Sequence, residues 1–372
     1  MKFTIVTHVE HIFEDNFYLA YAPYVREMNI WLNYVDEVII VAPLEFKKST
    51  EIHTRYKHKN IKFIPIPKMN LLSFKSVFMS ILHTPKVSWY IFKAMGDADH
   101  IHLRCPGNIG LLGCLIQVLF PNKVKTAKYA GNWDPKSKQP LSYKIQKWIL
   151  NNTILTKNCN TLVYGEWNGF SKNIRPFFTA TYREEDKDIV APRELTSTIR
   201  FLFVGTLSSG KRPLYVVQIV EKLSQLGYPV LLQFFGEGAE RTSLQEYCDE
   251  NQLNTIVEFK GNQLERVVRE AYKKSHFLLL PSESEGWPKV VAEAMFWGCL
   301  PIATKVSCVG EMLDYGKRGL LLKMDLDYDI EQIRAILKNL TEYNSKVQES
   351  ILWSRKYTLD LFENEIKELL HT

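Results

Sequence analysis

The feature that most constrains the fold is a regular alternation of short apolar runs and longer helical segments along all 372 residues. The short runs are rich in β-branched and aromatic residues, and such runs between helices favour parallel sheets built from βαβ units. We predict strands at residues 2–7, 37–42, 61–66, 100–104, 125–130, 160–164, 199–205, 230–235, 256–260, 276–280, 300–303 and 319–323. Two sets of six strands indicate an α/β protein with two domains, each long enough to bury its own core.

A charged segment without any periodicity, residues 181–197, separates the two halves. We interpret it as a linker between an N-terminal Rossmann-like domain (1–180) and a C-terminal one (198–350). Open α/β sheets bind ligands outside the carboxyl ends of their strands. Two such doubly wound domains are therefore expected to bind their ligands in a cleft between them.

Basic residues gather in the first half of the chain. Residues 51–150 contain 16 Lys and Arg but only 4 Asp and Glu, although the whole chain has a net charge of only +6. Apolar side chains interleave with this charge, as in the stretches 71–82 (with Lys75) and 89–93. Such a surface suits an anionic membrane. Nucleic acid is a rival partner, but no nucleic-acid-binding motif accompanies the charge, so none is expected; a plain solvated basic face is the third interpretation.

Cysteine usage and the apolar runs indicate the compartment. The six cysteines are scattered without a C-x-x-C pair, which suits a reducing cytoplasm. Residues 1–7 read as a strand rather than as a signal peptide, and the longest apolar run, 109–120, is too short to span a bilayer. The expected location is cytoplasmic, with peripheral attachment to the inner face of the cytoplasmic membrane as an open alternative.

The segment 281–298 carries the clearest chemical signal. It follows a buried strand, opens a helix, and places Glu285 and Glu293 eight residues apart. Free backbone N–H groups and the positive end of the helix dipole favour an anion at such a helix start. A ligand with both phosphates and hydroxyls would use the N–H groups and the two carboxylates together. A nucleotide sugar is a ligand of this kind.

The E-x7-E spacing, with Glu-Ala-Met inside it and Gly-Cys-Leu-Pro after it, resembles the signature of glycosyltransferase family 4 and related retaining GT-B enzymes. This resemblance implies a GT-B architecture, with two doubly wound Rossmann-like domains facing across a cleft. It also implies that residues 351–372 pack back on the first domain. The implied activity is transfer of a sugar from a nucleoside diphosphate sugar to a hydroxyl acceptor, with retention, in assembly of a surface polysaccharide such as capsule or lipopolysaccharide.

The resemblance extends to the loops of the second domain. Lys211 falls on the family's donor-phosphate lysine, whereas Thr206 stands where many members carry an arginine, for which Arg212 could substitute. Trp287-Pro288 replaces the commoner Phe-Gly, and proline lacks an N–H, so backbone contacts to the donor pass to Lys289 and Val290. The full set of donor-side residues that the resemblance implies is Gly205, Thr206, Lys211, Arg212, Gly236, Gly261, Asn262, Glu285, Gly286, Trp287, Lys289, Val290 and Glu293.

The resemblance assigns a role to each charged residue. Lys211 and Arg212 would stabilise the departing diphosphate, Glu285 would position the sugar through its hydroxyls, and Glu293 would hold the ribose. In the first domain His102 lies near the position of a family histidine that contacts the transferred sugar. Strand ends and loops that are expected to face the same cleft supply acceptor-side candidates: His8, Arg104, Asn108, Asn132 and Trp133.

Metal and dinucleotide cofactors are not expected. The D-x-D triplets 97–99 and 325–327 lack a convincing setting, because the first precedes its strand and the second suits a helix cap. The first strand has no G-x-G-x-x-G, and no P-loop or H-E-x-x-H is present. Two rivals remain: a nucleotide-sugar epimerase on the same fold, which would turn over donor alone, and a non-catalytic GT-B-shaped binding protein.

Overall fold

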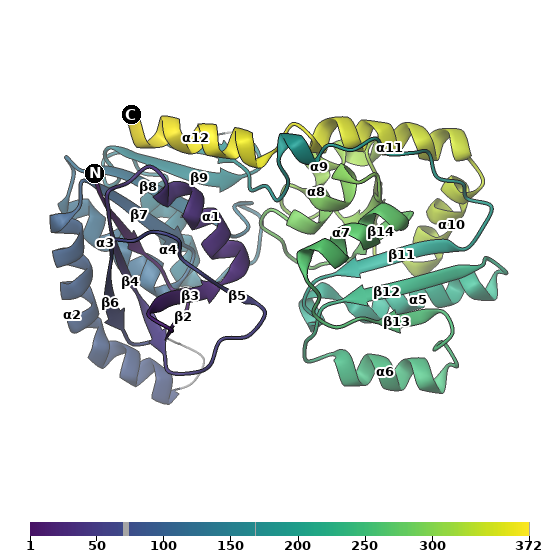
Figure 1. Cartoon of the computed structure of the whole chain (residues 1–372), viewed down its shortest axis with the longest axis horizontal. Coiled ribbons are helices and arrows are strands. Elements are labelled where there is room, and N and C mark those ends of the chain that lie inside the picture. The colour runs from purple at the N-terminus through teal and green to yellow at the C-terminus, as the bar shows by residue number, and fades with distance from the viewer. Residues whose placement is uncertain (70–73, 168, 372) are drawn as a thin grey trace. The chain divides into compact units, whose positions relative to one another are not determined.

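The computed structural model describes residues 1–69, 74–167 and 169–371, and the side chains of residues 74–76 stand outside this description. The chain forms two compact units (Figure 1). Unit 1 consists of Met1–Phe178 and Phe362–Thr372, and unit 2 consists of Thr179–Leu361. Each unit is described by itself below.

Unit 1 is built on a largely parallel sheet. Its strands are β1 (Lys2–Val6), β2 (His11–Glu14), β3 (Phe17–Tyr21), β4 (Glu37–Glu45), β5 (His53–Arg55), β6 (Ile61–Ile66), β7 (His100–Cys105), β8 (Val124–Tyr129), β9 (Cys159–Tyr164) and β10 (Ile174–Phe177). Seven of them pair in parallel in the order β10-β9-β8-β7-β1-β4-β6. The chain winds away from β1 in both directions, so the winding reverses between β1 and β7.

A small antiparallel extension was not predicted. β2 and β3 form a hairpin whose two turn residues, Asp15 and Asn16, have φ values of 50° and 64°. β5 pairs antiparallel with β3, and β2 joins the end of β4. The prediction of six strands in the first half is therefore incomplete, because it lacks β2, β3, β5 and β10.

Helices cover both faces of this sheet. They are α1 (Ala22–Leu32), α2 (Phe74–Asp97), α3 (Asn108–Ile116) with η1 (Gln117–Leu119), α4 (Leu141–Leu150) and α12 (Leu359–His371). Because crossovers between parallel strands are right-handed, α1 lies on one face and α2, α3 and α4 lie on the other. Accordingly, Trp31 of α1 contacts Phe3, whereas α2, α3 and α4 share a core cluster with Leu103 of β7. From Phe362 onward α12 belongs to unit 1, where the Phe362 ring contacts Phe177.

Unit 2 contains a six-stranded parallel sheet. Its strands are β11 (Ile199–Val204), β12 (Val230–Phe235), β13 (Val257–Phe259), β14 (Phe277–Leu280), β15 (Leu300–Thr304) and β16 (Leu320–Leu322), in the order β13-β12-β11-β14-β15-β16. This is a doubly wound order in which the winding reverses between β11 and β14. All twelve strands predicted from the sequence are present in the two sheets, with bounds that differ by only a few residues.

The helices of unit 2 pack on both faces of its sheet. The core on one face contains Phe201, Val216 and Ile333, and Leu202, which points to the opposite face, is fully buried as well. The helices are η2 (Glu184–Asp186), η3 (Ser209–Lys211), α5 (Pro213–Gln225), α6 (Arg241–Glu250), α7 (Glu265–Lys274), α8 (Lys289–Phe296), α9 (Val309–Met312), η4 (Asp314–Gly316), α10 (Leu326–Leu337) and α11 (Leu340–Ser354).

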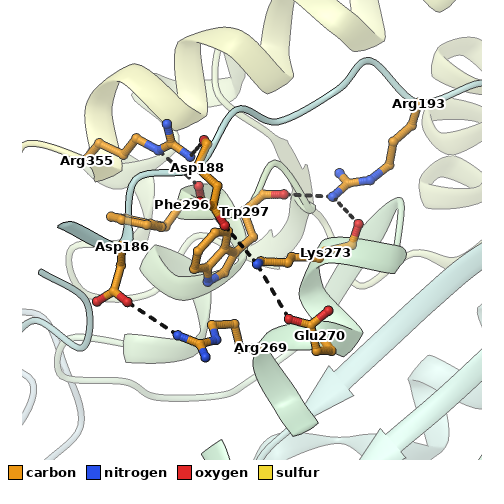
Figure 2. Close-up of polar contacts among 9 residues, drawn as sticks. All are labelled: Asp186, Asp188, Arg193, Arg269, Glu270, Lys273, Phe296, Trp297 and Arg355. Atoms are coloured by element: carbon orange, nitrogen blue, oxygen red, sulfur yellow. Dashed lines mark hydrogen bonds and ion pairs between the residues drawn. The ribbon is translucent and has the colours of Figure 1, made fainter. Parts of the chain in front are cut away.

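The charged segment 181–197, which the sequence predicts to be a linker, is fastened to unit 2 (Figure 2). Arg193 donates to the carbonyl oxygens of Tyr272, Lys273, Trp297 and Gly298, where α7 and α8 end. Asp186 pairs with Arg269 at 3.3 Å, and Asp188 pairs with Lys273 at 3.0 Å. A guanidinium satisfies orphan carbonyls at helix ends and interacts favourably with the helix dipoles. The segment is thus part of the packing of unit 2.

Candidate functional site

The point where the winding of unit 2 reverses brings two loops together. One loop follows β11 and contains Gly205 to Arg212, and the other follows β14 and contains Pro281 to Pro288. The backbone N–H of Glu283 donates to the carbonyl oxygen of Gly210 at 2.8 Å, which fixes the loops to each other. Ligands of doubly wound sheets bind at such a reversal, outside the carboxyl ends of the strands. This edge of unit 2 is therefore the candidate site.

Two ion pairs connect these loops. Lys211 pairs with Glu285, and Arg212 pairs with Glu283 at 3.1 Å. The sequence assigned Lys211 and Glu285 to different parts of a ligand but did not predict that they would touch. Their side chains are only 28% and 10% exposed, so the pair is held in a partly desolvated place where a charge acts more strongly than in water.

Glycines let neighbouring loops approach backbone to backbone. A Cβ on Gly236 would lie 2.0 Å from the carbonyl oxygen of Gly205, and one on Gly238 would lie 2.2 Å from that of Leu207. The N–H of Gly205 donates to Phe235, and the N–H of Gly236 donates to the carbonyl oxygen of Gly261, both at 2.9 Å. The loops after β11, β12 and β13 are thus stacked in order along one sheet edge. Gly238, which is absent from the predicted set of donor-side residues, is as tightly placed as Gly236.

The loop before α8 is anchored on both sides. The carbonyl oxygen of Gly286 accepts from the Ser307 hydroxyl at 3.1 Å, and Pro288 occupies the N-cap of α8. Lys289 and Val290 are the first two residues of α8, where the positive end of the helix dipole favours an anion. The Trp287 ring packs against Trp353 and Tyr357, at centroid distances of 6.0 and 5.4 Å. We therefore expect any donor contact of Trp287 to come from its backbone.

Glu293 lies one helical turn further along α8 and has partners of its own. Its carboxylate accepts from the hydroxyls of Thr181, at 2.7 Å, and Tyr272, at 3.0 Å. Burial raises the pKa of Glu293, although these two hydrogen bonds and the charge of Lys289 oppose the shift. Lys289 and Glu293 also line one small pocket of unit 2 together with Tyr182 and Tyr357. Two carboxylate oxygens offer about four acceptor sites, so Glu293 retains capacity for a further donor.

The remaining donor-side candidates lie at loop surfaces. Thr206 and Asn262 are exposed, and Gly261 has a φ of 65°. Asp325 and Asp327 follow β16, the edge strand of the unit 2 sheet. Asp325 caps α10 by accepting from the N–H of Tyr328. Asp99 accepts from the N–H of Lys2 at 2.7 Å. The triplet residues Asp99 and Asp325 thus have structural partners.

In unit 1 the structure corrects the prediction for His102. Its ring is fully buried between Phe3 and Trp31, and its Nδ1 lies 2.8 Å from the hydroxyl of Thr126. Desolvation, followed by the nearby His100, lowers its pKa well below the usual value, so it is a neutral core residue. It cannot contact a sugar, because a residue in the middle of a sheet covered on both faces points into the core.

Two of the acceptor-side candidates are also structural. Trp133 is 1% exposed and packs edge-on against Tyr129, so its predicted place at the acceptor is wrong. Asn132 is buried, and its side chain accepts from the N–H of Asp134 in a local turn, so it is not an open acceptor contact either. Asn132 and Trp133 both follow the end of β8, but their side chains are buried rather than open to the surface.

The other three acceptor-side candidates lie near the reversal point of unit 1. His8 is exposed in the loop after β1 and approaches Gly107, at which a Cβ would lie 2.8 Å from its Nδ1. Asn108 opens α3 and donates to the carbonyl oxygen of Met69 at 3.0 Å. Arg104, near the end of β7, pairs with Glu27 of α1 at 3.3 Å. These three residues lie at the sheet edge where a ligand is expected, so they remain candidates for acceptor contacts.

Sequence reasoning missed a buried charge cluster beside them. Glu27 pairs with both Arg104 and Lys128, the latter at 2.9 Å, and the side chains of Glu27 and Lys128 are only 5% and 1% exposed. Lys128 also lies over the rings of Tyr164, Phe177 and Phe362. The alternation of Arg104 and Lys128 with apolar neighbours in two adjacent strands was the available signal, because it puts both cations on one face of the sheet.

Comparison with known proteins agrees with the architecture of both units. Residues 184–350 match the family described as Glycosyl transferases group 1. An uncharacterized glycosyltransferase of Methanocaldococcus jannaschii is 29% identical over 139 residues, which cover 37% of this chain and 38% of that protein. Another from Haemophilus influenzae is 26% identical over 171 residues, or 45% and 48% of the two chains. These matches span less than half the length of either relative.

Solved structures resemble the chain over its whole length. Sucrose-phosphate synthase from Thermosynechococcus elongatus superposes with a TM-score of 0.70 at 15% identity and covers 100% of this chain and 98% of its own. Anabaena HepE, in complex with UDP and glucose, superposes with a TM-score of 0.72 at 11% identity and covers both chains fully. The chain therefore has the GT-B fold, and its residues 184–350 are similar to the glycosyl transferases group 1 family.

Proposed function

We propose that the protein is a glycosyltransferase that moves a sugar from a nucleoside diphosphate sugar to a hydroxyl acceptor. The observation that carries this proposal is the pairing of Lys211 and Glu285 across the two loops at the reversal point of unit 2. One cation and one carboxylate, side by side, match the two chemistries of a nucleotide sugar, its diphosphate and its hydroxyls. The group 1 domain and the UDP and glucose bound by Anabaena HepE support the same ligand class.

In the proposed reaction the bond between the anomeric carbon and the diphosphate oxygen breaks. A bond forms between that carbon and the acceptor oxygen, and the acceptor's proton passes to the departing phosphate. Lys211 and Arg212 would stabilise the negative charge that develops on the diphosphate. Glu285 would orient the sugar, and Glu293, fixed by Thr181 and Tyr272, would accept from the ribose hydroxyls. His102 has no role in this scheme.

The finer parts of the proposal follow the resemblance to glycosyltransferase family 4. They are retention of anomeric configuration through attack on the same face, a lipid-linked or oligosaccharide acceptor, and a role in surface polysaccharide assembly. Retention needs no carboxylate nucleophile in this scheme, because the acceptor attacks the anomeric carbon on the face from which the diphosphate leaves, and the leaving phosphate takes the acceptor's proton. A peripheral location on the inner face of the cytoplasmic membrane completes the proposal.

The experiment that tests this function measures release of nucleoside diphosphate from a panel of nucleotide sugars, with and without a mixed pool of lipid-linked and oligosaccharide acceptors. Release that depends on the acceptor, with the new glycosidic bond seen by NMR in the donor's anomeric configuration, is the expected result. Conversion of donor to a second nucleotide sugar without acceptor would instead identify an epimerase. Inverted product would contradict retention alone.

Activity is expected to survive an excess of EDTA. Lys211, Arg212 and the start of α8 can neutralise a diphosphate, and Asp99 and Asp325 accept backbone hydrogen bonds of their own. The initial rate of diphosphate release, measured before and after chelation, should agree within error. A rate that falls on chelation and returns with Mn²⁺ or Mg²⁺ would contradict this expectation and restore the D-x-D interpretation.

A further inference from the structure

Helix α2 of unit 1 is apolar on two opposite sides. Its inner side, with Val87, Ile91 and Met95, packs into the unit 1 core. On the outer side, large apolar residues at helical spacing are between 39% and 63% exposed: Phe78, Ile81, Leu82, Trp89 and Phe92. A helix that is apolar all round is normally covered on all sides. We therefore expect the apolar outer side of α2 to be covered by a binding partner.

The stripe of exposed apolar residues on the outer side of α2 continues over the neighbouring helices. The Phe92 ring contacts Phe120 just after η1, at 5.2 Å, and α3 and η1 expose Leu115 and Leu119 beside it. α4, which packs against α3, exposes three apolar residues at i, i+4 and i+7: Leu141, Ile145 and Trp148. α2, α3 and α4 cover the same face of the sheet of unit 1 (Figure 1), and these exposed residues lie on the outer side of that helical layer. We call this outer side of α2, α3 and α4, with the exposed apolar residues named above, the helical face.

The charge on the helical face is predominantly positive, because Asp97, the last residue of α2, is the single acidic residue in the sequences of α2, α3 and α4. Between Glu51 and Asp97 the sequence contains no acidic residue, and between Asp99 and Glu166 it contains only Asp134. Lys86 and Lys93 are exposed beside the stripe on α2, and Lys144 is exposed on α4. The side chain of Lys75 lies outside the described residues. Lysines flanking large apolar side chains complement a surface with anionic headgroups and an apolar interior.

We infer that the helical face docks on an anionic lipid bilayer, with its apolar residues inserted among the acyl chains and its lysines at the headgroups. None of the helices in the described part of the chain is long and apolar enough to cross a membrane. The protein would therefore lie on the bilayer, bound by both insertion and charge. Charge attraction alone would vanish with salt, whereas insertion adds a part that salt does not screen.

Vesicle sedimentation with the full chain tests this inference. Vesicles of phosphatidylglycerol and phosphatidylcholine in equal parts should bind the protein, and vesicles of phosphatidylcholine alone should bind it more weakly. Combining Leu82→Ser with Trp89→Ser should lower the partition coefficient by about tenfold or more, because two large apolar side chains leave the interface. Leu352→Ser, at 61% exposure on α11 of unit 2, is the matched control and should leave binding unchanged.

Three further readouts distinguish insertion into the bilayer from binding by charge alone and from a second copy of the chain. Brominated acyl chains should quench a part of the tryptophan emission that Trp89→Phe lacks. Combining Lys86→Glu with Lys93→Glu should weaken binding at low salt, whereas Lys338→Glu in unit 2 should not. Sedimentation velocity without lipid should show a monomer, and a dimer dissolved by Leu82→Ser would instead assign the face to a second copy.

The inference is overturned if the wild type binds neither vesicle, or if the Leu82 and Trp89 variant binds like the wild type. It is independent of the proposed donor chemistry, because nucleotide-sugar binding should be unchanged in every helical-face variant. Failure of vesicle binding would thus remove the proposed peripheral location but leave the proposed sugar transfer standing, and failure of donor binding would leave this inference standing.

Discussion

Replacing Lys211 with alanine is expected to lower the rate of sugar transfer by about 10²–10³-fold, because a preorganised charge facing the departing diphosphate is lost. Glu285→Gln should lower the rate to a similar extent, since Lys211 and Glu285 form one pair across the two loops. Both side chains are partly exposed, so the melting temperature should change little. The measurement is kcat for diphosphate release together with the thermal unfolding midpoint of each variant.

The control for this experiment is Lys338→Ala, which removes an exposed lysine after α10, far along the chain from both loops. It should keep the parental rate. The double variant of Lys211 and Glu285 should lose less than the product of the two single losses, as expected for residues that act as a unit. Near-parental turnover in either single variant, with the fold intact, would show that the site is placed wrongly.

Replacing Glu27 with glutamine is expected to destabilise unit 1 by about 3–5 kcal/mol, which is typical when one partner of a buried ion pair is removed. Lys128, with a 1% exposed side chain, and Arg104 would keep their charges but lose the carboxylate between them. The free energy of unfolding from a urea titration checks this expectation. Glu51→Gln, at an exposed position of the same unit, should change it by less than about 0.5 kcal/mol.

Restoring the charge balance of the buried cluster should recover part of the lost stability. Combining Glu27→Gln with Lys128→Met removes one carboxylate and one cation, so the double variant should be more stable than the sum of the single losses implies. A Glu27→Gln variant as stable as Glu51→Gln would contradict the buried cluster. Donor binding by unit 2 provides an internal control, because neither substitution lies in that unit.

The strands of both sheets could be predicted because parallel strands buried on two faces read as continuous apolar runs. The hairpin of β2 and β3 could have been found as well. Asp15-Asn16 between two apolar stretches is the two-residue turn that accepts positive φ at both positions. Its strands are short and carry exposed aromatics such as Phe13 and Phe17, so they do not stand out as a buried run.

The loops proposed to bind the donor could be located in the sequence because their residue pattern is local, as in the helix start after Glu285. The error at His102 has a different origin. Adjacent positions in a strand face opposite sides of the sheet, and the sequence does not say which side a helix such as α1 will cover. The pairing of Lys211 with Glu285, 74 residues apart, likewise depends on strand order, which brings β11 next to β14.

The most direct test of the central claim is a thermal-shift titration of the wild type and Lys211→Ala with a panel of nucleotide sugars. A ligand that binds only the folded protein raises the melting temperature with its concentration. We expect at least one nucleotide sugar to do so for the wild type, and the Lys211→Ala variant to need a much higher concentration for the same rise. If no nucleotide sugar raises the melting temperature, or if both proteins respond alike, the donor site at the loops after β11 and β14 is refuted.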